Sequence, residues 1–150
     1  MNAGAAAWHL ALVCDARVAT SRSFFHLHEV PDGFLPGMAT FRLAKFIGLG
    51  RARRMALSGR RVDAAEAERI GLVDRICADD ALDQTVREAL DEFRAMPPDA
   101  VELAKRLLNE SFAASYEDFV GGFLAAQHRA VQTDTFAAQL GKTNPSKSKD

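Results

Sequence analysis

Cysteine and long apolar segments are scarce in this 150-residue sequence, and each scarcity excludes a class of protein. The two cysteines, Cys14 and Cys77, form no C-x-x-C pair, which argues against a disulfide-stapled scaffold. Both lie in apolar stretches, so we expect buried free thiols in a reducing compartment. No apolar run approaches the roughly 20 residues that a membrane helix needs, and the first residues lack the basic segment of a secretory signal. We therefore expect a cytoplasmic protein with no membrane partner.

The sequence also lacks an excess of charge of either sign. It carries 19 basic and 20 acidic residues, which give a net charge of −1 at pH 7. This balance argues against a nucleic-acid partner. Hydrophobic residues make up 48% and charged residues 26%, as is typical of a globular protein. The length suffices for one modest domain with a single core.

Helical patterns dominate what is present. Apolar positions at helical spacing, together with capping residues, predict helices over 5–14, 38–48, 50–59, 63–71, 79–96, 98–112 and 115–140. Gly48, Gly59 and Gly71 are expected to end three of these, and Asp63 to cap one that has Glu66 in its first turn. Gly121 and Gly122 are expected to interrupt the last helix. Short strands are predicted over 16–20, 23–27 and 72–76. The expected fold class is α/β with a mostly helical C-terminal half.

Three stretches resemble one family in order and spacing. The first, GAAAWHLALVCDARVA (4–19), opens a helix with small residues and reaches a Cys-Asp pair before a strand. The second, FFHLHEVPDGFLPGMATFRLAKFIG (24–48), has the Phe, Glu, Gly, Pro-Gly and Arg-Leu positions of a catalytic loop and its next helix. The third is ALSGRRVDAAEAERIGLVDRI (56–76). Together they resemble the crotonase superfamily, whose best-known members are the enoyl-CoA hydratases and isomerases.

This resemblance covers nearly the whole chain but only the C-terminal portion of a full-length member. It implies part of a ββα spiral core with its following helices over 1–114, an oligomerisation helix over 115–140 and a disordered tail over 141–150. It also implies an acyl-CoA thioester substrate, with coenzyme A as part of the substrate and no separate cofactor. A homo-oligomer, trimer or hexamer, is expected.

The resemblance places a proton-moving carboxylate at Glu29, a residue that by itself would be typical of a solvated charge on a turn. The backbone N–H of Ala6 falls where the family stabilises the oxyanion of the thioester, and Gly37 falls where the backbone of the family's loop approaches the reacting centre. The other interpretations are a packed alanine, at a position where the family usually has glycine, and a simple turn glycine. The expected substrate-binding residues are Phe34, Leu35 and Pro36.

His9 departs from the hydratases, which have a second glutamate at this position. An imidazole can act as a base or hydrogen-bond donor there, or it can be a core histidine bonded to the backbone. We therefore expect His9 to accompany Glu29 in catalysis, and the substitution favours isomerisation over hydration. His26 and His28 share a strand face, but no third ligand follows at convincing spacing, so no metal site is predicted.

Two further points stay open in the sequence. Five arginines gather between positions 51 and 61, namely Arg51, Arg53, Arg54, Arg60 and Arg61. They form either a solvated helix end or a contact with the phosphates of coenzyme A. The chain itself is either an active acyl-CoA enzyme or a non-catalytic remnant that oligomerises or binds coenzyme A.

Overall fold

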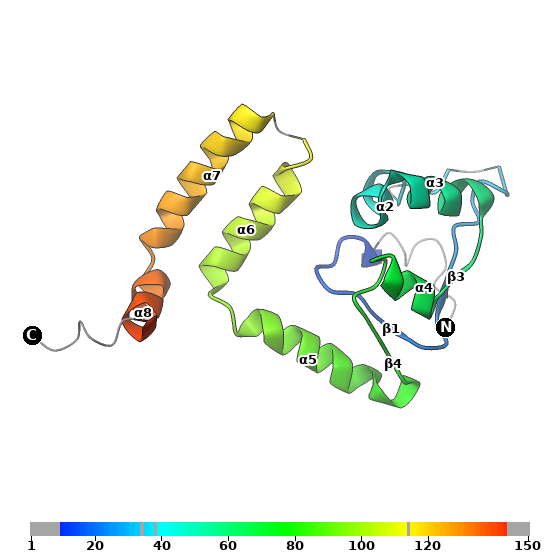
Figure 1. The fold of residues 1–150 in the computed structure, drawn as a ribbon, viewed down its shortest axis with the longest axis horizontal. Coiled ribbons are helices and arrows are strands. Elements are labelled where there is room, and N and C mark those ends of the chain that lie inside the picture. The colour runs from blue at the N-terminus through cyan, green and yellow to red at the C-terminus, as the bar shows by residue number, and fades with distance from the viewer. Residues whose placement is uncertain (1–9, 34, 38, 114, 144–150) are drawn as a thin grey trace, which may run out of the picture. The chain divides into compact units, whose positions relative to one another are not determined.

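The computed structural model describes residues 10–33, 35–37, 39–113 and 115–143 (Figure 1). The chain divides into two compact units, Met1–Ala89 and Leu90–Asp150, and each is described by itself. Predicted helix 5–14 lies largely outside the described residues. Of its described part, residues 10 and 11 are helical and a turn follows.

The first unit contains two small sheets of two strands each (Figure 1). Strand β1 (Val18–Thr20) pairs in parallel with β4 (Arg75–Cys77), first residue opposite first residue. Strand β2 (Phe24–Phe25) pairs antiparallel with β3 (Val62–Asp63). Segments far apart in the sequence are therefore tied together around the 26–37 loop.

Three helices of the first unit begin and end where local signals require. Helix α2 (Ala39–Ile47) ends before Gly48, and α3 (Leu49–Ser58) ends at Gly59, whose φ is +61°. Only glycine adopts such left-handed backbone without strain. The Asp63 side chain caps α4 (Ala64–Arg69) by accepting a hydrogen bond from the Glu66 N–H at 2.8 Å. These helix ends confirm the sequence prediction.

The core of the first unit is built from aliphatic side chains of these elements. Its largest side chains with almost no exposed surface are Leu12, Leu27, Leu43, Ile47, Met55, Val62 and Leu72. They come from β3, from α2 and α3, and from the turns and loops between elements. Burial of this apolar surface is the main favourable contribution to the folding of the unit.

One buried cation joins several of these segments. The backbone N–H of Arg17 donates to one carboxylate oxygen of Asp74 at 2.7 Å, and its guanidinium donates to the other at 2.9 Å. The same guanidinium donates to the carbonyls of Leu72 at 2.9 Å and Cys14 at 3.3 Å. It also lies 4.1 Å from the centre of the Phe46 ring. Arg17 thus fixes the approach to β1, the turn before β4 and the end of α2.

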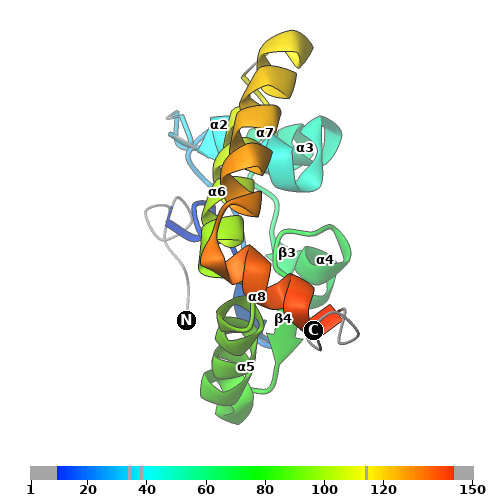
Figure 2. The same cartoon turned by 90° about the vertical axis from the view of Figure 1, so that its left-hand side faces the viewer.

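In the second unit, the regular elements of the described residues are all helices. After a 3₁₀ turn at Asp79–Ala81, α5 (Leu82–Arg94) crosses the division between the two units. Helices α6 (Pro98–Glu110) and α7 (Tyr116–Val131) lie side by side in both views (Figures 1 and 2). Helix α8 (Asp134–Thr143) follows.

The predicted break of the last helix is in the wrong place. Helix α7 passes through Gly121 and Gly122 without interruption and ends at Val131. The break comes instead at Thr133, whose hydroxyl accepts a hydrogen bond from the Phe136 N–H at 3.2 Å and so caps α8. A Cβ at Gly122 would meet the side chain of Leu107 on α6 at 3.9 Å. This glycine therefore lies where α7 faces its neighbour rather than at a helix end.

The strands are shorter than predicted, and the last one is displaced. Leu72 and Val73, expected in a strand, lie in a turn because both backbone N–H groups donate to the carbonyl of Ala67, at 2.8 and 3.3 Å. Strand β3 was not predicted. The thiols are free, but Cys14 is exposed rather than buried, since it lies in the turn ahead of β1, and Cys77 is half-buried.

We expect Arg17→Met to lower the free energy of unfolding by about 2–3 kcal/mol, because it removes the guanidinium from one oxygen of Asp74 and from the buried carbonyl of Leu72. The matched control is Arg22→Met, whose side chain is 83% exposed and pairs with Asp79 at the surface. That change is expected to cost no more than about 0.5 kcal/mol. Urea unfolding measures both, and equal losses would contradict the anchoring role of Arg17.

Candidate functional site

Glu29 lies in the loop between β2 and α2, within a turn that runs to Gly33. Both oxygens of its carboxylate are buried, and neither has a hydrogen-bond partner among the described residues. Burial of an ionised carboxylate without a partner costs free energy. Native proteins retain such groups chiefly at functional sites. The structure therefore singles out Glu29 within the loop.

Hydrogen bonds within the loop fix the backbone around Glu29. The N–H of Asp32 donates to the carbonyl of His28 at 3.3 Å, and that of Gly33 donates to Val30 at 3.0 Å. Gly33 has a φ of +83°, which suits the close of the turn. The side chains of His28 and Asp32 are exposed and lie 3.5 Å apart, so their ion pair contributes little. The turn is thus ordered mainly by its backbone.

The turn that follows α3 packs directly against this loop. A Cβ at Gly59 would lie 2.7 Å from Cγ of Pro31 and 3.3 Å from the carbonyl oxygen of Leu27. Any side chain at position 59 would therefore push the two segments apart. The sequence predicted Gly59 as a helix end but did not indicate this second role, because the contact joins segments some thirty residues apart.

The end of the loop is held by the first turn of α2. The side chain of Pro36 is fully buried, whereas Leu35 is 83% exposed. Gly37 has a φ of +46°, and its carbonyl accepts hydrogen bonds from the Thr40 hydroxyl at 2.7 Å and the Thr40 N–H at 3.2 Å. The predicted substrate-binding residues Leu35 and Pro36 thus differ sharply in their access to solvent.

Three of the predicted site residues, Ala6, His9 and Phe34, lie outside the described residues. The structure brings Glu29, Pro36 and Gly37 into one loop. The proposed roles of all these residues remain predictions.

Aromatic contacts line the strand that enters the loop. The Phe24 and His26 rings stack with centres 5.8 Å apart, and His26 meets His28 edge-on at the same separation. The guanidinium of Arg61 lies 3.4 Å from the centre of the Phe24 ring. Within the described ranges, no group of three or more His, Cys, Asp or Glu side chains is placed to hold a metal ion. In the same ranges, no helix is both long enough and apolar enough to cross a membrane.

Comparisons with known proteins agree with the resemblance noted in the sequence. Residues 2–139 match the enoyl-CoA hydratase/isomerase family. The chain is 37% identical over 110 residues to a probable enoyl-CoA hydratase, echA8, of Mycobacterium bovis, which covers 73% of the chain and 43% of that protein. It is 35% identical over 101 residues to a short-chain-enoyl-CoA hydratase of Clostridium acetobutylicum, covering 67% and 39% respectively.

Solved structures give the same result for the fold. A probable enoyl-CoA hydratase/isomerase from Mycobacterium abscessus is 31% identical, with a TM-score of 0.81, over 93% of this chain and 55% of that one. An enoyl-CoA hydratase from Bacillus anthracis is 27% identical, with a TM-score of 0.84, over the same fractions. The chain thus spans about half the length of the proteins it matches. It belongs to the enoyl-CoA hydratase/isomerase family and has part of the α/β crotonase-like fold.

Proposed function

We propose that the chain is a crotonase-like acyl-CoA enzyme, an enoyl-CoA isomerase or hydratase, in which Glu29 moves the proton. The buried carboxylate of Glu29, with no hydrogen-bond partner among the described residues, carries this proposal. Family membership supports it, as do relatives named as enoyl-CoA hydratases. A carboxylate that is not engaged by the protein remains available to a substrate proton.

The chemistry proposed for the site is stabilisation of a thioester enolate. Removal of a proton beside the thioester carbonyl places negative charge on the carbonyl oxygen. A backbone N–H group, proposed at Ala6, would donate a hydrogen bond to that oxygen, and such a donor contributes about 3–4 kcal/mol. The backbone of Gly37 would approach the reacting centre. Phe34, Leu35 and Pro36 would contact the acyl chain.

One carboxylate is enough for isomerisation, because the same group can take a proton from one carbon and return it to another. Hydration also requires a group that orients or deprotonates water. In this chain His9 is the candidate for that role, since it stands where the hydratases have a second glutamate. The absence of a glutamate at position 9 favours isomerisation within the proposal.

The second candidate function is a non-catalytic one, in which the chain oligomerises or binds coenzyme A. The observation that favours it is the histidine at position 9, where the hydratases have a second glutamate. Turnover measurements on the 150-residue chain distinguish the two candidates. The first proposal, an acyl-CoA enzyme, includes the cytoplasmic location expected from the sequence.

We expect Glu29→Gln to reduce turnover of crotonyl-CoA or a 3-enoyl-CoA by about 100-fold or more, because the amide cannot accept the proton. The matched control is Asp32→Asn, which removes an exposed carboxylate from the same loop and should leave the rate near that of the parent. Absorbance of the enoyl thioester and product analysis measure the reaction. A parent chain that acts on neither substrate would overturn the enzymatic proposal, and equal rates in parent and Glu29→Gln would remove Glu29 from it.

Gly59→Ala should lower kcat by about tenfold or more with a smaller change in KM, because the added methyl displaces Pro31 and with it the backbone of Glu29. Gly48→Ala is the control. Gly48 shares the positive φ, at +78°, but a Cβ there would meet nothing within 4 Å. The backbone strain is expected to be larger in Gly48→Ala, because Gly48 has a ψ of 152° whereas Gly59 is left-handed helical with a ψ of 19°. A larger loss of kcat in Gly59→Ala therefore reports the contact with Pro31 and not backbone strain. Equal kcat values for the two would contradict a positioning role for Gly59.

We also propose that the chain forms a homo-oligomer, a trimer or hexamer, through its C-terminal helices. Large apolar side chains are exposed on α7, among them Leu124 at 60% and Phe123 at 43%. Light scattering is expected to give a mass that is three or six times 16.3 kDa. Leu124→Glu should reduce this mass, whereas Leu57→Glu, at a comparably exposed position of α3, should not. A monomeric parent would contradict the proposal.

A further inference from the structure

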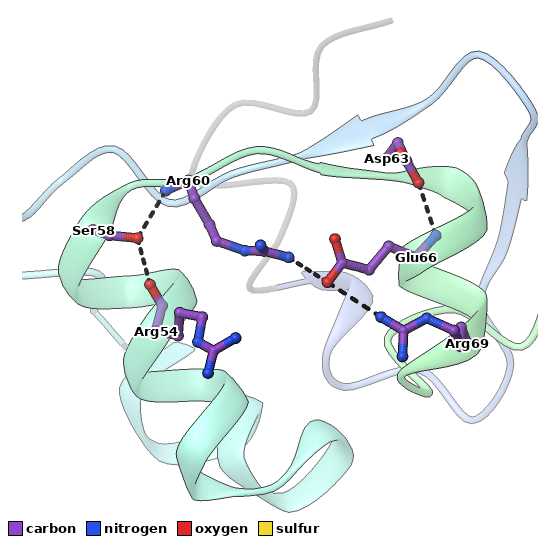
Figure 3. Close-up of polar contacts among 6 residues, drawn as sticks. All are labelled: Arg54, Ser58, Arg60, Asp63, Glu66 and Arg69. Carbon is purple, nitrogen blue, oxygen red and sulfur yellow. Dashed lines mark hydrogen bonds and ion pairs between the residues drawn. The ribbon is translucent and has the colours of Figure 1, made fainter.

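Arginine side chains converge on a pocket of about 180 Å³ between α3, the turn after it and α4 (Figure 3). From this geometry we infer that the pocket binds a phosphoryl group. The inference goes beyond the proposed function, because none of the described residues of the 26–37 loop lines the pocket.

Four arginines from three segments line the pocket. Arg51 and Arg54 come from α3, Arg60 from the following turn and Arg69 from α4. Glu66 is the one acidic residue in the lining, so the formal charge is +3. Convergence of several guanidinium groups at one concave site is typical of oxyanion binding, because each presents a planar fork of N–H donors.

Part of this charge is held in place by Glu66. One of its carboxylate oxygens pairs with the guanidinium of Arg60 and lies 3.5 Å from that of Arg69 (Figure 3). The backbone of Glu66 is fixed in turn by the cap from Asp63. Two of the arginines therefore already have an anionic partner, so a phosphoryl group competes with Glu66 for their guanidinium groups.

Arg54 supplies a cation that is not engaged. In the described part of the chain its guanidinium has neither an ion-pair nor a hydrogen-bond partner, and it extends toward the space between α3 and α4 (Figure 3). Arg53, on the same helix, does not line the pocket. The sequence cluster between positions 51 and 61 therefore separates into residues that face the pocket and residues that do not.

Three residues that line the pocket, Met55, Val62 and Ile70, are apolar and buried. Met55 and Val62 are each 1% exposed and Ile70 is 8% exposed. These apolar side chains offer little hydrogen bonding, so the arginines of the lining must hold a ligand. A group with several anionic oxygens can accept hydrogen bonds from several of these arginines at once. A phosphoryl dianion also offsets more of the +3 charge of the lining than a carboxylate does. Phosphoryl groups are therefore the class that fits best.

Titration calorimetry of the 150-residue chain at low salt distinguishes two sources of the phosphoryl group, namely a free phosphate and coenzyme A. The probes are inorganic phosphate, coenzyme A and dephospho-coenzyme A, which lacks the phosphate on the ribose. Tighter binding of coenzyme A than of dephospho-coenzyme A, with the difference lost in Arg54→Gln, supports the site and identifies the ribose phosphate as its ligand. Binding of inorganic phosphate that depends on Arg54, with no such difference, supports the site for a free phosphate.

Three variants are expected to change the affinity for the phosphate probe differently. Arg54→Gln should weaken binding of the phosphate probe about tenfold, since it removes a charge-assisted contact. Glu66→Gln should strengthen binding, because it removes the one negative charge from the lining. Arg53→Gln should leave the affinity unchanged.

Several results would overturn the inference. These are no binding of any probe, an equal loss of affinity in Arg53→Gln and Arg54→Gln, and weaker binding in Glu66→Gln. Circular dichroism confirms that each variant is folded before it is titrated. Turnover of thioesters plays no part in this test, so its outcome is separate from that of the proposed function.

Discussion

The buried guanidinium of Arg17 ties together the parts of the first unit that local sequence cannot. The backbone N–H of Arg17 donates to one oxygen of Asp74, and the guanidinium donates to the other. The guanidinium also donates to the carbonyls of Leu72 and Cys14. The two sheets have only two strands each, so backbone pairing alone gives little resistance to displacement. A buried cation has a different effect, because any displacement leaves charged or polar groups unpaired in the interior. The register of β1 with β4, and the position of α2 against them, depend on this interaction.

The loop that carries Glu29 is held between elements positioned in this way. Its entry is fixed by the pairing of β2 with β3, its middle by contact of Pro31 with Gly59, and its exit by the buried Pro36. Burial of the Glu29 carboxylate without a partner opposes folding. The fold tolerates this cost because the contacts at its entry, middle and exit hold the loop in place. Arg60, which directly follows Gly59, and Glu66 line the arginine-lined pocket.

Local chemistry explains which features the sequence could predict. Gly59 and the Asp63 cap were predicted because a left-handed residue and an N-cap are signals of a few adjacent residues. The strand pairing of β3 could not be predicted, because a two-residue strand has no period and its partner lies far away in the chain. The break between α7 and α8 was placed at Gly121 and Gly122, although the cap at Thr133 determines it. Glu29 was indicated by resemblance alone, since its unpartnered burial is a tertiary property. The inclusion of Arg69 and Glu66 in the pocket is tertiary in the same way.

Abstraction of a substrate proton by the carboxylate at position 29 underlies the whole functional account. Exchange of the α-hydrogens of butyryl-CoA in deuterated water measures this step directly, because a saturated thioester can neither be hydrated nor isomerised. Proton NMR should show incorporation of deuterium beside the thioester carbonyl with the parent chain, and none above background when residue 29 is glutamine. Absence of exchange with the parent, or equal exchange in both, would contradict the account.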